Sequence, residues 1–546
     1  MDVGSADGER AGGARAPTVS SGARSRWRRW ARDWGWLVGI AVAYLYVFPY
    51  FPKITSANEL PRVYLVKAIA DEHSFAIDRG VAQWGGTADV SPSAGHQYSN
   101  KAPGSSMLAA PPYWIASRLG GPPSLATAMW IARVFAGIVP ALAFLALLAR
   151  FLSRYAPDPA VRRLVLVAYG LGSLAMTYSI LFYSHQLGAV CVASAWIVAL
   201  DVADGKRPLR AMAIAGALAG AAPLVDYQAL FAAVPVAIHV TVRLARALPR
   251  ARLGRAIALA TVGALVPIAI LLAYHAACFG SPWRTGYNAS TTFAMYHQHG
   301  FLGITALRWE ALVGSLVHLD NGLVALSPWW LLALPGTWVL VRIGERGTAL
   351  VGAAVAVIYV LFISSINFWR GGWGVGPRYI AAMLPFLLPA VCASLQWLAD
   401  ARARTRWALP ALGVAAGTIV VGVVIYSLSS ATFPYWPDSL HHPLYEITFR
   451  LLRDGLAAPS LGSALGVPGV AGIVPYLLVV AAVLGVALHR ACGSRGAVLA
   501  LATGLTVLAL SRLAPHGGRE PDRAYAFVRA AVLQGAASTM TAIPAR

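Results

Sequence analysis

Glu59 and Arg62 lie three positions apart in a polar segment that follows the first long apolar run of the chain. On a helix, residues at this spacing share a face, so the carboxylate and the guanidinium group would lie side by side. A neighbouring cation keeps a carboxylate ionised, and an ionised carboxylate can take a proton from an incoming hydroxyl. Glu59 is therefore the predicted general base, and a purely structural ion pair at a helix end is the alternative.

Lys101 follows a polar turn that contains Asp89, His96 and Tyr98, and it precedes an apolar stretch. A lysine at such a boundary often does no more than extend its ammonium group into the headgroup layer. The alternative is that Lys101 is a point charge for a phosphate at that level. On this second interpretation Asp89, His96 and Tyr98 are candidate substrate-binding residues, although a single histidine is more often structural.

A glycine-rich turn at 371–376 is bracketed by Arg370 and Arg378 and contains Trp373. Glycines let the backbone approach a ligand closely. Two arginines can hold a phosphodiester through paired hydrogen bonds, and the flat indole of Trp373 suits a sugar ring or a prenyl chain. A belt of Trp and Arg at a membrane surface would give the same composition, so this alternative stays open.

The composition indicates that most of these residues belong to a membrane protein. Apolar residues make up 58% of the 546 positions and charged residues 12%, and the mean hydropathy is +0.61. These values exclude an ordinary soluble domain. The net charge of +22 comes from Arg clusters between apolar runs, which is typical of topology signals and not of nucleic-acid binding. The four cysteines all fall inside apolar runs and are expected to be small core residues.

A bilayer needs roughly 20 apolar residues per helix, and this criterion predicts an all-α polytopic membrane protein with about thirteen transmembrane helices. The first apolar run is too long for a cleavable signal peptide. The spans are expected near 34–51, 124–149, 164–182, 186–203, 211–225, 227–242, 256–278, 322–341, 348–366, 379–399, 407–428, 472–489 and 496–511.

The alternation of basic connections with connections that lack Lys and Arg places the N-terminus in the cytoplasm. Four polar segments then lie on the extracytoplasmic side, at 52–123, 279–321, 367–378 and 429–471. Within the first, Asn58 to Glu72 is predicted as an amphipathic juxtamembrane helix with Asn58 as its N-cap. The chain thus divides into a disordered basic cytoplasmic tail (1–33), a main transmembrane part (34–428), an extracytoplasmic loop (429–471), two C-terminal spans (472–511) and an extracytoplasmic tail (512–546).

The first outer segment resembles that of the GT-C membrane glycosyltransferases. The similarity lies in Asn58-Glu-Leu-Pro-Arg-Val-Tyr64 followed by Tyr98-Ser-Asn-Lys-Ala-Pro-Gly104, and segments 320–330 and 369–379 support it. The relatives are the lipid A aminoarabinose transferase and protein O-mannosyltransferase group and the actinobacterial-type membrane mannosyl- and arabinosyltransferases. In that group an Asp-Glu pair precedes Arg-Tyr, whereas this sequence has Asn58 at the first acidic position. Glu59 is then the single matching carboxylate.

The resemblance implies a bacterial plasma-membrane enzyme that transfers a sugar from a polyprenyl phosphate to a glycan, lipid or protein acceptor outside the cytoplasm. Glu59 would activate the acceptor hydroxyl, and the leaving phosphate would be stabilised by Lys101, Arg378, Arg370 and Arg62. No metal ligand is assigned, but a divalent cation near Asp78 and Asp89 stays an open alternative. The competing interpretation is a transporter or flippase for a lipid-linked substrate, which predicts internal repeats and charges at the bilayer midplane.

Overall fold

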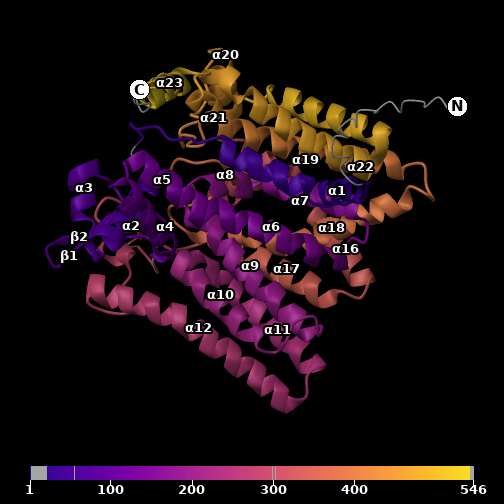
Figure 1. Cartoon of the computed structure of the whole chain (residues 1–546), viewed down its shortest axis with the longest axis horizontal. Helices are drawn as coiled ribbons and strands as arrows, with labels where there is room; N and C mark the ends of the chain where they lie inside the picture. The colour runs from indigo at the N-terminus through magenta and orange to yellow at the C-terminus, as the bar shows by residue number, and fades with distance from the viewer. Residues whose placement is uncertain (2–20, 55, 298, 302, 541–546) are drawn as a thin grey trace.

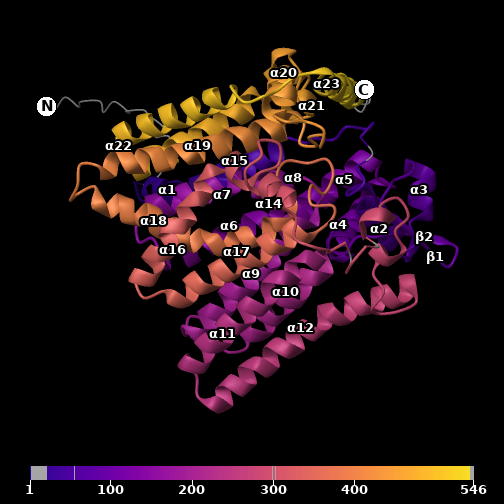
Figure 2. The same cartoon turned by 180° about the vertical axis from the view of Figure 1, so that it is seen from behind.

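The protein is a bundle of long apolar helices with a polar end built from its outer segments (Figure 1). In Figures 1 and 2, α12 (Arg250–Phe279) runs along one side, and α19 (Ala408–Thr432) and α22 (Gly469–Ser511) run along the opposite side. Between these sides lie α6 (Val139–Phe151) and α9 (Ser184–Ala203). The computed structural model describes residues 1, 21–54, 56–297, 299–301 and 303–540.

Within these described residues, eight helical segments are long and apolar enough to cross a membrane, or nine if one bent pair counts as a span. The prediction of a polytopic α-helical membrane protein is confirmed. Besides α9, α12, α19 and α22, the eight comprise α5 to η2 (Leu125–Arg133, Val134–Ile138, Val139–Phe151, Leu152–Arg154), η3 with α11 (Tyr227–Ala232, Ala233–Ala247), α17 (Arg346–Ser365) and η6 with α18 (Arg378–Met383, Leu384–Ala401).

The bent pair is α7 (Pro159–Leu171) and α8 (Leu174–Ile180), which meet at 53°. The bend has a local cause, because the Ser173 side chain accepts a hydrogen bond from the backbone N–H of Ala175 and so caps a new helix. The chain after α8 leads through Tyr183 into α9 at the polar end. This bend thus brings two segments of the bundle to the place where the outer segments lie.

The count of about thirteen spans is not confirmed. The predicted span 322–341 is divided among α15 (Leu323–Leu326), η5 (Pro328–Leu332) and α16 (Ala333–Arg342), and α10 (Ala211–Val225) is short. The two predicted C-terminal spans lie in α22, whose backbone leaves the helical conformation between them, at Gly493 (φ 72°). Near the first end of α22, Tyr46 donates to the Gly472 carbonyl; near the second end, Tyr445 donates to the Leu508 carbonyl and a ring nitrogen of His442 lies 3.1 Å from that of Ser511.

Helix α1 (Ser21–Tyr46) begins inside the stretch predicted to be a disordered tail, so from Ser21 onward the chain is helical; residues 2–20 lie outside the described part. The remaining short elements belong to the outer segments. They are η4 (Gly286–Ala289), α13 (Ala294–His297), α14 (Trp309–Leu316), η7 (Leu444–Thr448), α20 (Phe449–Arg453), α21 (Leu461–Ala464) and α23 (Arg519–Met540).

The first outer segment contains α2 (Leu60–Glu72), α3 (Asp78–Trp84), a hairpin of β1 (Val90–Ser93) and β2 (His96–Ser99), and α4 (Gly104–Gly120). The antiparallel hairpin is an addition to the all-α prediction. Ala94 and Gly95 form its turn with φ of 49° and 82°, the backbone twist that suits a two-residue hairpin. A second difference concerns α2, which is mostly buried and does not lie on the surface as an amphipathic helix.

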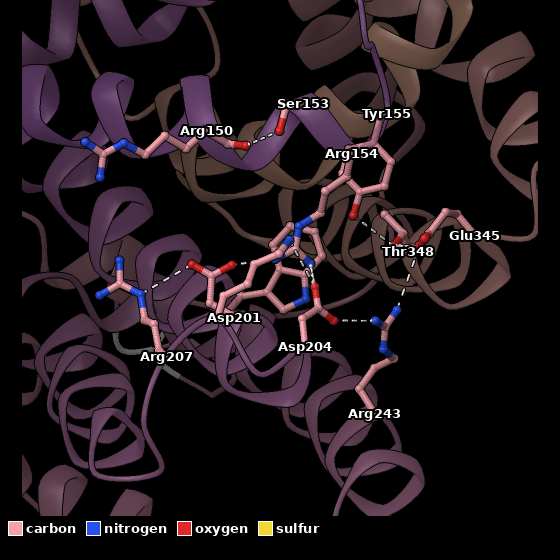
Figure 3. A network of polar contacts seen from close by, with 12 residues as sticks. Arg150, Ser153, Arg154, Tyr155, Asp201, Asp204, Arg207, Arg243, Glu345 and Thr348 are labelled. Atoms are coloured by element: carbon pink, nitrogen blue, oxygen red, sulfur yellow. Dashed lines mark hydrogen bonds and ion pairs between the residues drawn. The ribbon is translucent and has the colours of Figure 1, made fainter.

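At the other end of the bundle, four of the basic connections predicted to be cytoplasmic meet in one network (Figure 3). Arg154 pairs with Asp201 and with Asp204, and Arg243 pairs with Asp204 at 2.8 Å. Arg243 also lies 3.9 Å from Glu345 at the start of α17. The carboxylates at the end of α9 and the start of α17 thus join Arg154 of η2 and Arg243 of α11 in one cluster.

Candidate active site

A cavity of about 360 Å³ lies at the polar end, where the first outer segment meets the glycine-rich turn. It is walled by charged and amide side chains, by aromatic rings and by glycine backbone. Its lining consists of Ile54, Ser56, Ala57, Asn58, Asp89, Lys101, Tyr183, Tyr287, Phe293, Tyr296, Phe368, Gly371, Gly372, Trp373, Arg378, Tyr379, Tyr435 and Asp438.

Asp89 and Lys101 form an ion pair in this wall, with 2.8 Å between Oδ2 and Nζ and side chains only 7% and 8% exposed. The hairpin positions both groups, because Asp89 precedes β1 and Lys101 follows β2. Asn100 donates to the other Asp89 oxygen at 2.9 Å, and the Lys101 ammonium lies 5.5 Å from the centre of the Tyr287 ring. The sequence places Asp89 and Lys101 in the same polar stretch but does not predict the ion pair between them.

Arg378 enters the cavity from the first residue of η6 and is buried. Its guanidinium donates to the carbonyl oxygens of Trp373 and Gly371 and lies 5.0 Å from the centre of the Tyr183 ring. Among the described residues, no carboxylate forms an ion pair with it and its Nε has no hydrogen-bond partner. The site therefore contains a buried cation whose charge is not neutralised by a direct contact.

The glycine-rich turn needs its glycines to hold Arg378 in this position. Gly371, Gly372 and Gly376 have φ of 73°, 81° and 72°, a region that side chains disfavour. A Cβ on Gly371 would lie 3.1 Å from Nε of Arg378, and a Cβ on Gly376 would lie 2.8 Å from Leu174. The turn thus brings backbone carbonyls against the guanidinium without steric conflict.

Aromatic side chains form the opposite wall of the cavity. Phe368 stacks on Tyr296 with 4.5 Å between ring centres and on Phe293 with 5.6 Å. Trp373 is 36% exposed, and the Phe527 ring of α23 packs edge-on against it at 5.8 Å. The C-terminal helix therefore reaches the rim of the cavity.

Glu59 lies behind the cavity wall, and the ion pair with Arg62 that its spacing predicts does not form. Arg133 holds the Glu59 carboxylate instead, with Nε and Nη2 donating to its two oxygens at 3.0 and 3.1 Å. The backbone N–H of Phe182 and the hydroxyl of Tyr435 donate to the same carboxylate at 2.7 and 2.5 Å. Burial and the Glu59 charge raise the pKa of Tyr435 well above its usual value, so its phenol stays protonated and donates this bond. Every Glu59 oxygen is thus occupied by protein donors.

Arg62 is also structural in this arrangement. Its guanidinium donates to Asn58, to the Ala102 carbonyl and to the hydroxyls of Ser105 and Ser184. Burial lowers the pKa of Arg62 from its usual value. Asn58 consequently accepts a hydrogen bond from Arg62 and is not the N-cap of α2. Glu59 occupies the N-cap position, and its side chain accepts no hydrogen bond from the first turn of α2. Arg62 holds α2, α4 and the start of α9 together.

Four of the predicted site residues line the cavity and the others lie outside it. Asp89, Lys101, Trp373 and Arg378 are in the wall. His96 is exposed and bonds with Asp78, whose other oxygen accepts from the Gln97 N–H. The remaining predicted residues contact other parts of the fold: Tyr98 packs against Phe279, and Arg370 pairs with Asp320.

Several cavity residues were not assigned to the site from the sequence. Asn58 belongs to the first resembling motif but was expected as an N-cap, and only the fold brings it together with Tyr183, Tyr287, Phe293, Tyr296 and Phe368, which belong to no motif. Tyr435 and Asp438 come from the segment Pro434-Tyr-Trp-Pro-Asp438, whose aromatic and proline residues are an available signal for a segment that covers the cavity. His185 forms a buried 2.7 Å contact with Asp226 close behind Tyr379, outside the lining.

No protein-family model matches this chain, and no curated protein matches its sequence. Solved structures do resemble it. ArnT from Cupriavidus metallidurans in the apo state is 15% identical, over 89% of this chain and 77% of that chain, with a TM-score of 0.43. The same protein bound to undecaprenyl phosphate gives 13% identity over 90% and 77%, with a TM-score of 0.41.

Two further structures show a similar likeness. The Archaeoglobus fulgidus oligosaccharyltransferase is 11% identical over 76% of this chain and 57% of that chain, with a TM-score of 0.45. The arabinosyltransferase EmbB from Mycobacterium smegmatis is 13% identical over 97% of this chain and 42% of its own, with a TM-score of 0.42. These likenesses, at 15% identity or less, concern the helical fold alone.

Proposed function

We propose that this chain is a membrane glycosyltransferase that moves a sugar from a polyprenyl phosphate to an acceptor hydroxyl on the extracytoplasmic side. One observation supports this most directly: Lys101 and Arg378, from different outer segments, line a single cavity together with the carboxylate of Asp89. The aromatic rings of the facing wall suit a sugar or the first prenyl units of a donor.

The phosphate of the donor would bind between Lys101 and Arg378. A buried guanidinium without a carboxylate partner is costly, and an anionic ligand would offset that cost. Nε of Arg378 retains an unused donor, and Lys101 has an ammonium group that can be shared between Asp89 and a phosphate oxygen. Both cations would then stabilise the negative charge that develops as the phosphate leaves.

Asp89 is the better candidate for the general base, because each of its oxygens has one protein partner whereas each Glu59 oxygen accepts two hydrogen bonds. In the proposed step the acceptor oxygen bonds to the anomeric carbon and its proton passes to Asp89. The bond between the anomeric carbon and the phosphate oxygen breaks, and its electron pair leaves with the phosphate. Direct attack of this kind inverts the anomeric centre. Glu59 acts instead as a positioning residue that fixes Tyr435 and the neighbouring Asn58 in the wall.

The proposal assigns no metal ligand. Among the described residues, no three His, Cys, Asp or Glu side chains gather as a metal site would require. Asp78, which the sequence suggested as a partner of Asp89 for a cation, bonds with His96 and the Gln97 N–H. The positive charge at this site therefore comes from side chains in the proposed mechanism.

The test measures transfer from radiolabelled polyprenyl-phosphate sugars to membrane extracts by the purified full-length protein. Asp89→Asn and Lys101→Ala should each abolish transfer while the thermal unfolding profile stays cooperative. Asp78→Asn is the matched control, because it removes a carboxylate from the same outer segment outside the cavity. Transfer that survives both cavity substitutions would contradict the proposed site. Movement of the intact lipid-linked substrate across vesicles without transfer would favour the transporter alternative.

A further inference from the structure

Another cavity lies where α1, α7 and α22 meet, near the basic end of the bundle that the charge distribution predicts to be cytoplasmic. Its volume is about 250 Å³. One part of its wall is apolar and another part is cationic. The residues that matter here are Gly35, Trp36, Arg163, Val483, Val486 and Arg490.

The cavity exists because α1 and α22 separate over one helical turn. At Gly39 the two helices touch, since a Cβ there would lie 2.2 Å from a methyl group of Val483. At Gly35, one turn earlier on α1, nothing lies within 4 Å of the position that a Cβ would take. The absent side chain of Gly35 thus leaves a wedge between the helices.

The wall of this wedge combines apolar side chains with cationic ones. Val486 is 51% exposed and continues an apolar strip with Val483 along α22, which suits a hydrocarbon chain. Arg163 and Arg490 rim the same space with guanidinium groups. Arg163, whose side chain is 17% exposed, pairs at 2.9 Å with Asp33, whose side chain is 57% exposed; water screens this partner carboxylate, so another anion can replace it.

We propose that this cavity binds an anionic diacyl phospholipid, with its phosphate between Arg163 and Arg490 and one acyl chain along Val483 and Val486. Basic pockets between transmembrane helices on the cytoplasmic side favour such headgroups. A zwitterionic lipid brings an ammonium group that the two arginines repel, and free phosphate lacks the hydrocarbon that the apolar strip would contact. The lipid would join α1 to α7 and to α22.

The first test fills the wedge. Gly35→Leu places a side chain in the open space, and Gly254→Leu on α12 is its matched control, because nothing lies within 4 Å of a Cβ there either. Delipidated full-length protein in detergent is titrated with phosphatidylglycerol, and binding is followed by native mass spectrometry and by melting temperature. We expect one tightly bound lipid in the wild type and in Gly254→Leu, and its loss in Gly35→Leu.

The second test removes the charge without filling the space. Arg163→Gln combined with Arg490→Gln should weaken phosphatidylglycerol binding roughly thirty-fold, whereas Arg252→Gln on α12 should not weaken it. Equal binding of phosphatidylcholine, or stabilisation by inorganic phosphate alone, would overturn the proposal. The proposal would also be overturned if the protein bound polyprenyl phosphate more tightly than phosphatidylglycerol and kept this preference after both arginine substitutions. Because the readout is binding, its outcome is independent of the sugar transfer proposed at the other end.

Discussion

Glu59 and Arg133 form a two-pronged ion pair inside the protein, with side chains only 1% and 2% exposed. Arg133 closes α5 directly before the π-helical turn η1, and Glu59 stands at the start of α2. The pair therefore fixes the first outer segment to the long helix that follows it. Tyr435, from a segment far along the chain, bonds to both residues and extends the connection to the rim of the cavity.

Glu59→Gln should destabilise the protein by about 3–5 kcal/mol, because it leaves the buried Arg133 without its counterion. The measurement is thermal or denaturant unfolding of the purified protein in detergent. Glu310→Gln, at an exposed position in another outer segment, should leave the unfolding midpoint unchanged. If Glu59→Gln were fully stable but inactive, Glu59 would be a general base after all and not a positioning residue.

Tyr435→Phe removes one hydroxyl and keeps the ring in the cavity wall. We expect a loss of about 1–3 kcal/mol in unfolding free energy, since the substitution removes one buried hydrogen-bond partner each from Glu59 and Arg133. The raised pKa of Tyr435 means that its contribution to stability is fully present below the ordinary tyrosine pKa and disappears only as pH rises through the raised value. Wild type and variant should therefore differ by the same free energy at about pH 6 and pH 8. A difference that vanished at the higher pH would contradict this assignment.

Arg378→Lys tests whether the shape of the guanidinium matters as well as its charge. Lysine keeps one positive charge but cannot reproduce donation to Trp373 and Gly371 together with a free Nε for the donor phosphate. The apparent KM for the donor should rise about ten- to a hundred-fold, the equivalent of one or two charged hydrogen bonds. Arg370→Lys, outside the cavity lining, is the control and should change the KM little.

Gly376→Ala should destabilise the glycine-rich turn and lower transfer activity. Its φ of 72° disfavours a side chain by about 1–2 kcal/mol, and the new Cβ would also press on Leu174 and on the Tyr426 hydroxyl. Gly85→Ala provides the comparison, because Gly85 has a positive φ of 97° with open space around it. Circular dichroism melts and the transfer assay should both show the larger effect at Gly376. Equal effects at the two glycines would mean that the contacts around Gly376 add nothing.

The hydrophobic pattern was sufficient to predict a polytopic helical bundle, because an apolar run of bilayer length satisfies its backbone hydrogen bonds in lipid by forming a helix. It was insufficient for the number of spans. Pro328 divides one predicted span into short pieces, an effect of a single residue that a hydropathy window averages away. The two predicted C-terminal spans, in contrast, lie on either side of the non-helical Gly493.

Spacing along the sequence was least reliable for predicting which charged side chains pair with each other. Glu59 and Arg62 are near neighbours in sequence, but each finds its partners in distant segments, at Arg133 and Ser184 respectively. Asp89 and Lys101 are different, because the hairpin between them sets their distance locally and the sequence already placed them in one turn. Contacts decided by the fold, such as those of Tyr183 and Phe368, had no local signal strong enough to assign them to the cavity.

The reversal of α22 at Gly493 has a practical consequence for anyone who produces this protein. The chain continues from α22 through Ser511 to α23, and Phe527 of α23 packs against Trp373 at the cavity rim. A reporter or purification tag fused to the C-terminus therefore follows a helix that borders the cavity, and under the proposed function such a fusion would lower transfer without damaging the core. Tags placed before α1 start from the far end of the bundle and avoid that obstruction.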